Sequence, residues 1–182
     1  MSNDVIEVPP LSRGDIRRYA DLIRNLAFRE LGISSAYFPI VDIVERLLPR
    51  IDPDFHLEIL EAEEMGDVHG LTVPSQHVIK LREDVYEGAC NGGGRDRMTV
   101  GHELGHYILH DDLRFPRQMK ASDLPAYQNA EWQANCFAAE LLVPAKRACI
   151  CGDASTIANL FGVSHESAAY QYRVLKKEGL IK

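Results

Sequence analysis

Two stretches near the start of the chain place their apolar residues at helical spacing. In the first, apolar side chains recur every three or four positions over residues 16–31, after a capping pair made by Ser12 and Asp15 and before Gly32. The second covers residues 39–49 and begins with a proline, whose fixed φ suits the first turn of a helix. The pattern predicts two amphipathic helices with a structural role.

The apolar pattern changes to a period of two at Phe55. Phe55, Leu57 and Ile59 alternate with their neighbours, and residues 71–73 and 77–81 form two more short runs that favour β-strand. We therefore expect a small antiparallel sheet. The run at residues 77–81 is a candidate edge strand that binds an extended peptide by strand addition, or else an ordinary edge strand protected by its charged side chains.

Glycine is concentrated in residues 86–97, which hold Gly88, Gly92, Gly93 and Gly94. Closely spaced glycines disfavour both helix and strand. The composition predicts a mobile loop that leads into the segment with candidate chemistry.

That segment contains the pattern H-E-x-x-H, formed by His102, Glu103 and His106. Residues four apart project from one face of a helix, so both imidazoles can bind one Zn²⁺. Glu103 lies about 100° around the helix, beside the metal, where a carboxylate acts as general base in metalloproteases. Gly101 and Gly105 each cost about 1 kcal/mol of helix propensity relative to alanine, which indicates that close packing selected them.

A catalytic zinc site usually takes three protein ligands, so a third is expected elsewhere in the chain. Glu131 opens an Ala-rich helical segment and shares one face of it with two alanines and Asn135, an arrangement that lets the helix approach the His helix closely. We predict that Glu131 is the third ligand. Asn135 is predicted to accept a hydrogen bond from the outer nitrogen of a ligating imidazole, and Glu140 is the competing carboxylate.

Residues 155–177 have the cadence of a helix-turn-helix, with Gly162 at the turn. A helix that reads DNA usually presents its N-terminal residues to the bases. Here that end carries Glu166, and the positive charge lies at the far end of the second helix, at Arg173, Lys176 and Lys177. We favour a packing or docking module, and direct DNA binding is not expected.

Composition and charge narrow the possible functions. The 182 residues, 46% hydrophobic and 26% charged, correspond to about 1.2 globular domains, and the net charge of −7 argues against a whole-protein phosphate-binding surface. The chain has neither an apolar run long enough to span a membrane nor a basic start typical of a targeting peptide. The chain has four irregularly spaced cysteines, Cys90, Cys136, Cys149 and Cys151, which favour free thiols in a reducing compartment. We therefore expect a cytoplasmic protein.

These motifs resemble those of the ImmA/IrrE metallopeptidases, a family with a minimal thermolysin-like, gluzincin-like core. The resemblance covers about 50 residues, at positions 95–100, 102–110, 131–135 and 137–144. It implies zinc ligands at His102, His106 and Glu131, with Glu103 as general base. A donor for the oxyanion is not identified, and Tyr107, Tyr127 and His110 are candidates by their position in the sequence.

Together with the element pattern, the resemblance implies an α+β fold. We expect a zincin-like metallopeptidase domain at residues 11–150, with the small antiparallel sheet and the HExxH helix. Residues 151–182 are expected to form a helical, helix-turn-helix-like C-terminal subdomain.

The resemblance also implies a function in transcription regulation and the stress response. The expected activity is that of a zinc endopeptidase that cleaves an XRE-type helix-turn-helix repressor, either phage-type or a stress-response regulator. The alternative is a non-catalytic DNA- or protein-binding regulator, or a toxin-antitoxin component, that retains the fold. The complete H-E-x-x-H favours the enzyme, because a relic has no need of Glu103. A His₂Glu donor set suits Mn²⁺ or Fe²⁺ as well as Zn²⁺.

Overall fold

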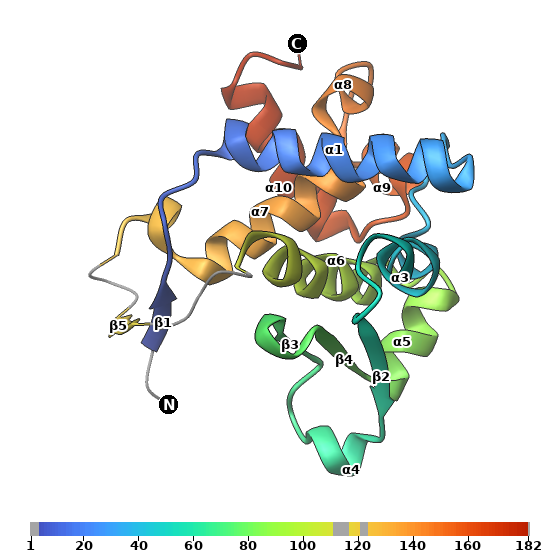
Figure 1. The fold of residues 1–182 in the computed structure, drawn as a ribbon. Helices are drawn as coiled ribbons and strands as arrows, with labels where there is room; N and C mark the ends of the chain where they lie inside the picture. Colours follow the sequence, from blue (N-terminus) through green and yellow to red (C-terminus); the bar gives the residue numbers. More distant parts are fainter. Residues whose placement is uncertain (1–3, 111–116, 121–123, 182) are drawn as a thin grey trace.

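The computed structural model describes residues 4–110, 117–120 and 124–181. It is a mixed α+β fold, mostly helical, in which helices stack in layers above a small sheet (Figure 1). Helix α1 (Arg13–Leu31) lies across α7 (Ala130–Leu142), and α7 packs on α6 (Gly94–Leu109). The sheet contacts α6 on its other side, so α6 is the central element.

Both helices expected near the start of the chain are present. α1 begins after Ser12 with a capping box to Asp15 and ends at Gly32, whose φ of 70° is left-handed. The second segment consists of α2 (Ile40–Asp42), the π-helical turn η1 (Ile43–Leu47) and α3 (Leu48–Ile51), and it continues two residues beyond Pro49. The expected end at that proline is wrong, because the wider π-turn changes the hydrogen-bond pattern just ahead of a residue that lacks an N–H.

The sheet is mixed, so the expected purely antiparallel sheet is wrong. Its strands are β2 (His56–Leu60), β3 (Gly70–Val73) and β4 (Val78–Arg82), in the order β2-β4-β3, with β2 parallel and β3 antiparallel to β4. The predicted edge strand is wrong as well, because β4 lies in the centre. β4 buries Val78, Ile79 and Leu81. The most apolar strand buries most apolar surface in the centre of a sheet, where neighbours cover it on both sides.

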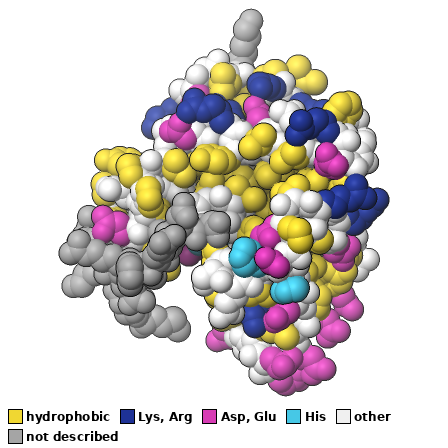
Figure 2. All heavy atoms as spheres, viewed as in Figure 1, with side chains coloured by type: hydrophobic (Ala, Val, Ile, Leu, Met, Phe, Trp, Pro, Cys, Tyr) yellow, Lys and Arg dark blue, Asp and Glu magenta, His cyan; other side chains and the backbone are white. Residues whose placement is uncertain are grey.

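The chain between β2 and β3 contains the short helix α4 (Ala62–Met65), and these two strands do not form a hairpin. On the face of the molecule in Figure 2, acidic side chains gather where α4 lies, and basic side chains are spread along the part formed by α1. The negative net charge is therefore unevenly distributed over this face.

Residues 86–97 are largely helical, which corrects the expected loop. α5 (Glu83–Cys90) ends at a short turn, and α6 begins at Gly94. The glycines serve close packing: a Cβ on Gly88 would lie 2.2 Å from the Asp96 carboxylate, and one on Gly94 would lie 2.4 Å from the backbone nitrogen of Ser164. Within this segment, Gly92 alone has a positive φ, at 83°.

Two further strands, β1 (Asp4–Glu7) and β5 (Arg117–Lys120), pair antiparallel and were not predicted. A 3₁₀ turn, η2 (Pro74–Gln76), links β3 to β4, and another, η4 (Ala126–Gln128), precedes α7. None of the helices among the described residues is long and apolar enough to cross a membrane.

The C-terminal part contains α8 (Ala145–Ala148), α9 (Ala154–Phe161) and α10 (His165–Lys177). Gly162 lies between α9 and α10 with a left-handed φ of 64°. Phe161 and Leu175 are fully buried and belong to the same apolar core as Ile16 of α1 and Leu104 of α6. The four cysteines are all free, and two of them are buried.

Candidate metal centre

The two histidines of the H-E-x-x-H pattern project from one face of α6. His102 and His106 are one helical turn apart, with their ring centroids 4.6 Å apart and their Nε2 atoms 3.0 Å apart. On the neighbouring face of α6, which packs against α7, glycines take the place of larger side chains. There Gly105 lies against the backbone of Ala134, where an added Cβ would come within 3.0 Å, so the two helices approach closely, as the glycines predicted.

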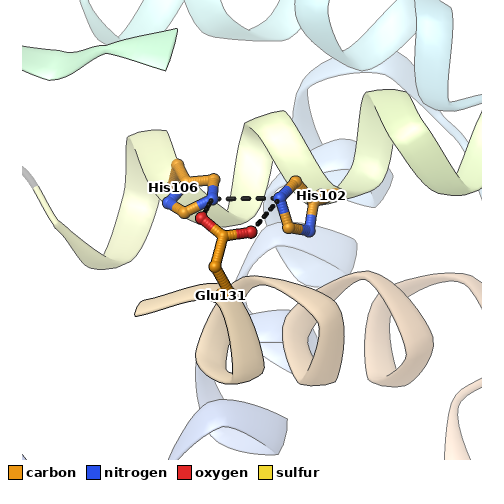
Figure 3. Close-up of side chains that lie close together, drawn as sticks. All are labelled: His102, His106 and Glu131. Carbon is orange, nitrogen blue, oxygen red and sulfur yellow. Dashed lines mark hydrogen bonds and ion pairs between the residues drawn. The ribbon is translucent and has the colours of Figure 1, made fainter. Parts of the chain in front are cut away.

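Glu131 reaches the same point from the first turn of α7 (Figure 3). Asn129 caps this helix by accepting hydrogen bonds from the backbone N–H groups of Glu131, at 2.9 Å, and Trp132, at 3.1 Å. The carboxylate then straddles the two imidazoles, with Oε2 3.2 Å from His102 Nε2 and Oε1 3.3 Å from His106 Nε2. The structure thus brings together the three side chains that the sequence nominated as ligands.

The candidate donor atoms lie at, or slightly below, the spacing of ligand atoms around a tetrahedral cation. With metal–ligand distances of about 2.0 to 2.2 Å and tetrahedral angles, two ligand atoms lie about 3.3 to 3.5 Å apart. Here the two Nε2 atoms lie 3.0 Å apart, and they lie 3.2 and 3.3 Å from the two different oxygens of Glu131. Two imidazoles and one carboxylate grouped in this way would hold a divalent metal ion.

Electrostatics at the three residues are coupled. The contacts of its carboxylate with His102 and His106 hold the pKa of Glu131 well below its usual range. Burial lowers the pKa of His102, but its hydrogen bond to Glu131, the charge of Glu103 and a hydrogen bond to Asn135 outweigh burial and raise it. The carboxylate is therefore ionised at neutral pH and available as a ligand.

Glu103 is buried on the adjacent face of α6, where strand β3 covers it. Its Oε2 accepts a hydrogen bond of 2.7 Å from the hydroxyl of Thr72. Gly70 makes room for it, since a Cβ there would lie 2.6 Å from Glu103 Cγ. No pattern in a single sequence pointed to Gly70 or Thr72, because their role depends on how β3 pairs.

Asn135 lies one turn beyond Glu131 and is exposed. Its amide Nδ2 donates to the Glu131 carbonyl at 2.8 Å, and the side chain contributes to the raised pKa of His102. Its predicted role at the outer nitrogen of a ligand stays a prediction. Glu140, the competing carboxylate, is fully buried and paired with Arg13 and Arg17 at 2.9 and 2.7 Å, and so belongs to a different cluster.

The residue that contacts the outer nitrogen of His106 is His110, at 3.0 Å between the two Nδ1 atoms. Burial and the charge of His106 lower the pKa of His110 to about 4. His110 was predicted only as a candidate oxyanion donor, although its spacing of four residues from His106 indicates this contact. Of the other two candidates, Tyr107 directs its hydroxyl to Asp52, and Tyr127 is half-exposed.

Comparisons with known proteins address the fold and the family of this chain. Among solved structures, the chain is similar to a Mycobacterium tuberculosis transcriptional regulator, with 14% identity and a TM-score of 0.51 over 87% of this chain. The similarity covers 50% of that protein, so this chain spans about half its length, and at this identity it supports the fold alone. No curated protein matches the sequence.

A family model, the IrrE N-terminal-like domain of Peptidase_M78, matches residues 62–173. The match extends from α4 to α10 and includes the H-E-x-x-H of α6 and the glutamate of α7. It points to a metallopeptidase-type function and agrees with the resemblance noted from the motifs. Since the match covers more than half of the sequence, the chain belongs to the IrrE N-terminal-like (Peptidase_M78) family.

Proposed function

We propose that this protein is a zinc-dependent endopeptidase that holds its metal with His102, His106 and Glu131 and uses Glu103 as general base. The observation that carries the proposal is the contact of both imidazoles with each other and with the Glu131 carboxylate, at 3.0 to 3.3 Å between the atoms involved, beside the buried carboxylate of Glu103 on the helix of the histidines. Membership in a peptidase family supports this choice over other metal-dependent reactions.

A divalent cation bound there supplies Lewis acidity to a water molecule and to a peptide carbonyl. The chain's own residues handle the protons. Glu103 accepts a proton as the water attacks and delivers it to the leaving amine, which is general acid-base catalysis by one carboxylate. Thr72 fixes Oε2 of that carboxylate through its hydroxyl, so Glu103 does not have to be oriented anew at each turnover.

In this proposal the substrate binds along β3. Among the described residues β3 pairs with β4 alone, so its other edge can accept an extended backbone, and its Thr72 contacts Glu103. Strand addition was one of two alternatives for residues 77–81, and we propose it for β3 because β3 lies at the edge of the sheet.

A pocket of about 430 Å³ lies between α7 and α10, one turn of α7 beyond Glu131. Asn135, Cys136 and Ala139 line it from α7, and Tyr170 and Arg173 line it from α10. We infer that it takes an apolar side chain of the substrate, because apolar surface predominates in its lining.

The proposed substrate is an XRE-type helix-turn-helix repressor, cleaved in a transcriptional or stress response. The motif resemblance supports this substrate class. The similar solved structure is itself described as a transcriptional regulator, but it shares only the fold with this chain. Zinc is the proposed metal, with Mn²⁺ and Fe²⁺ as the alternatives that metal analysis will distinguish.

The finer fold and location assignments are also part of this proposal. Residues 11–150 form the zincin-like domain and 151–182 the helix-turn-helix-like subdomain, for which the left-handed Gly162 between α9 and α10 is the supporting feature. Burial of Phe161 and Leu175 in the common core supports packing as its role and not DNA reading. The free cysteines support a cytoplasmic location.

The proposal is tested with purified protein, zinc and a helix-turn-helix repressor encoded beside this gene. We expect zinc-dependent cleavage of the repressor by the wild type. Glu103→Gln is expected to retain zinc and lose cleavage by a factor of at least about 100. Glu87→Gln, an exposed glutamate on α5, is the matched control and is expected to cleave at the wild-type rate.

Two results would contradict the proposal. Equal cleavage by wild type and Glu103→Gln would exclude that residue as the base. Zinc binding without cleavage of any neighbouring repressor by the wild type would favour a non-catalytic regulator.

A further inference from the structure

A row of polar side chains leads from His106 away from the metal site into the protein. His106 Nδ1 lies 3.0 Å from His110 Nδ1, and His110 Nε2 lies 3.2 Å from Gln133 Oε1. Gln133 Nε2 then donates two hydrogen bonds of 2.8 Å, to the carbonyls of Pro9 and Tyr127. His110 is 4% exposed and Gln133 0%, so bulk water does not compete for these contacts.

The two carbonyls determine where every proton in the row lies. A carbonyl oxygen only accepts, so the Gln133 amide must direct Nε2 toward Pro9 and Tyr127 and Oε1 toward His110. His110 must then donate from Nε2, which leaves the lone pair of a neutral ring on Nδ1. His106 therefore donates from its own Nδ1.

This order leaves the lone pair of His106 on Nε2, the atom that faces His102 and Glu131. In the opposite tautomer, an Nε2 proton would occupy the direction in which a metal binds, and two lone pairs would face each other between His106 and His110. The row thus favours the tautomer that can act as a ligand before any metal arrives.

We propose that His110 and Gln133 are positioning residues that fix the tautomer and the ring orientation of His106 and thereby increase the metal affinity of the site. The inference rests on the metal site proposed above. Outer contacts to metal-binding histidines typically change metal affinity by about 10- to 100-fold.

The row also connects the site to the N-terminal segment. Val8 donates from its backbone to Gln128 at 2.9 Å, and Leu11 donates to Tyr127 at 3.0 Å. These bonds hold the Pro9 carbonyl in place for Gln133, more than 120 residues away in the sequence. Docking of this segment is therefore part of what orients His106.

The first experiment measures zinc affinity by competition with a chromophoric chelator. His110→Leu removes the acceptor for His106 and is expected to weaken zinc binding about 10- to 100-fold. His110→Asn, whose Oδ1 can take the place of the imidazole Nδ1, is expected to restore affinity to within about threefold of wild type. Gln133→Leu is expected to weaken binding about tenfold.

Gln171→Leu is the matched control. Gln171 is also fully buried, and it donates to Glu140 and to the Val143 carbonyl, away from the three ligands. Its loss is expected to reduce stability without changing zinc affinity. Equal zinc affinity in His110→Leu and Gln171→Leu would overturn the proposal.

The second experiment needs no variant that alters the row. Long-range ¹H–¹⁵N correlation spectra of the metal-free wild type at about pH 8 report the tautomer of each histidine. We expect His106 to carry its proton on Nδ1, and a proton on Nε2 would overturn the inference even if His110→Leu fails to fold. A wild type that binds zinc no better than Glu131→Gln would instead contradict the proposed metal site.

Discussion

Glu140 and Glu131 are the two glutamates of α7 that were considered as metal ligands, and their surroundings predict opposite effects of substitution on stability and on zinc binding. Its side chain is fully buried and accepts from Arg13 Nη1 at 2.9 Å, from Arg17 Nε at 2.7 Å and from Gln171 Nε2 at 3.2 Å. These contacts join α1, α7 and α10. Replacing it with glutamine preserves the shape but removes the charge that two arginines share and directs an NH₂ group toward one of them.

The cost follows from this geometry. Removing one partner of a buried ion pair typically costs 3 to 5 kcal/mol, because the remaining charge is left uncompensated. Here the arginine side chains keep 13% and 23% exposure, and Arg17 retains Glu178 at 2.7 Å, so we expect a loss near the lower end, about 3 kcal/mol. For a chain of this length, that loss lowers Tm by about 6 to 12 °C.

The assay pairs Glu140→Gln with Glu131→Gln in thermal unfolding followed by circular dichroism, together with a zinc titration. Glu140→Gln is expected to lose stability and retain zinc affinity. Glu131→Gln, whose side chain is 54% exposed, is expected to change metal-free stability by less than about 1 kcal/mol and to lose zinc binding. The reasoning is refuted if the two effects are exchanged, or if Glu140→Gln lowers Tm by less than about 2 °C.

Three further predictions concern metal, thiols and packing. Zinc at about 100 times its Kd is expected to stabilise the protein by about 2.7 kcal/mol, a gain that a chelator reverses and that Glu131→Gln lacks. Gly105→Ala is expected to lower the free energy of unfolding in urea by about 1 to 2 kcal/mol, because overpacking against the backbone of Ala134 exceeds the gain in helix propensity. Gly152→Ala, with open space around the added Cβ, is the control and is expected to leave stability unchanged. Equal stability of the two variants would contradict the packing argument. Burial raises the pKa of Cys136 to about 12, so its thiolate fraction at pH 8 is about 10⁻⁴. A thiol-reactive dye is therefore expected to label the exposed Cys90 and Cys149 in the folded protein, and the buried Cys136 and Cys151 only after unfolding.

The grouping of the three candidate ligands was predictable because it depends on spacing within two helices and on small residues between them. His102 and His106 are one helical turn apart whatever the rest of the chain does. Gly101 and Gly105 on α6, facing alanines on α7, indicated that the two helices lie close enough for Glu131 to reach both rings. These are short-range signals that survive errors elsewhere in the fold.

Glycine itself was ambiguous, and residues 86–97 show why. The same residue type permits a positive φ, as at Gly92, or allows close approach of a neighbour, as at Gly88 and Gly94. Only the second use is compatible with a helix. Choosing between them requires knowing what lies opposite, such as the backbone of Ser164 against Gly94, and that contact is 70 residues away in the sequence.

Strand order limited the prediction of the site more than any helix did. Whether β4 or β3 lies at the edge depends on pairing between distant segments, which hydrophobic alternation within each strand does not determine. The error did not affect the three candidate ligands, because they lie on α6 and α7, but it hid the surroundings of Glu103. Gly70 and Thr72 become relevant only once β3 lies against α6, and they decide where the carboxylate points. The grouping of the candidate ligands and the placement of Glu103 are thus encoded differently: the first in helical spacing, the second in the pairing of a sheet.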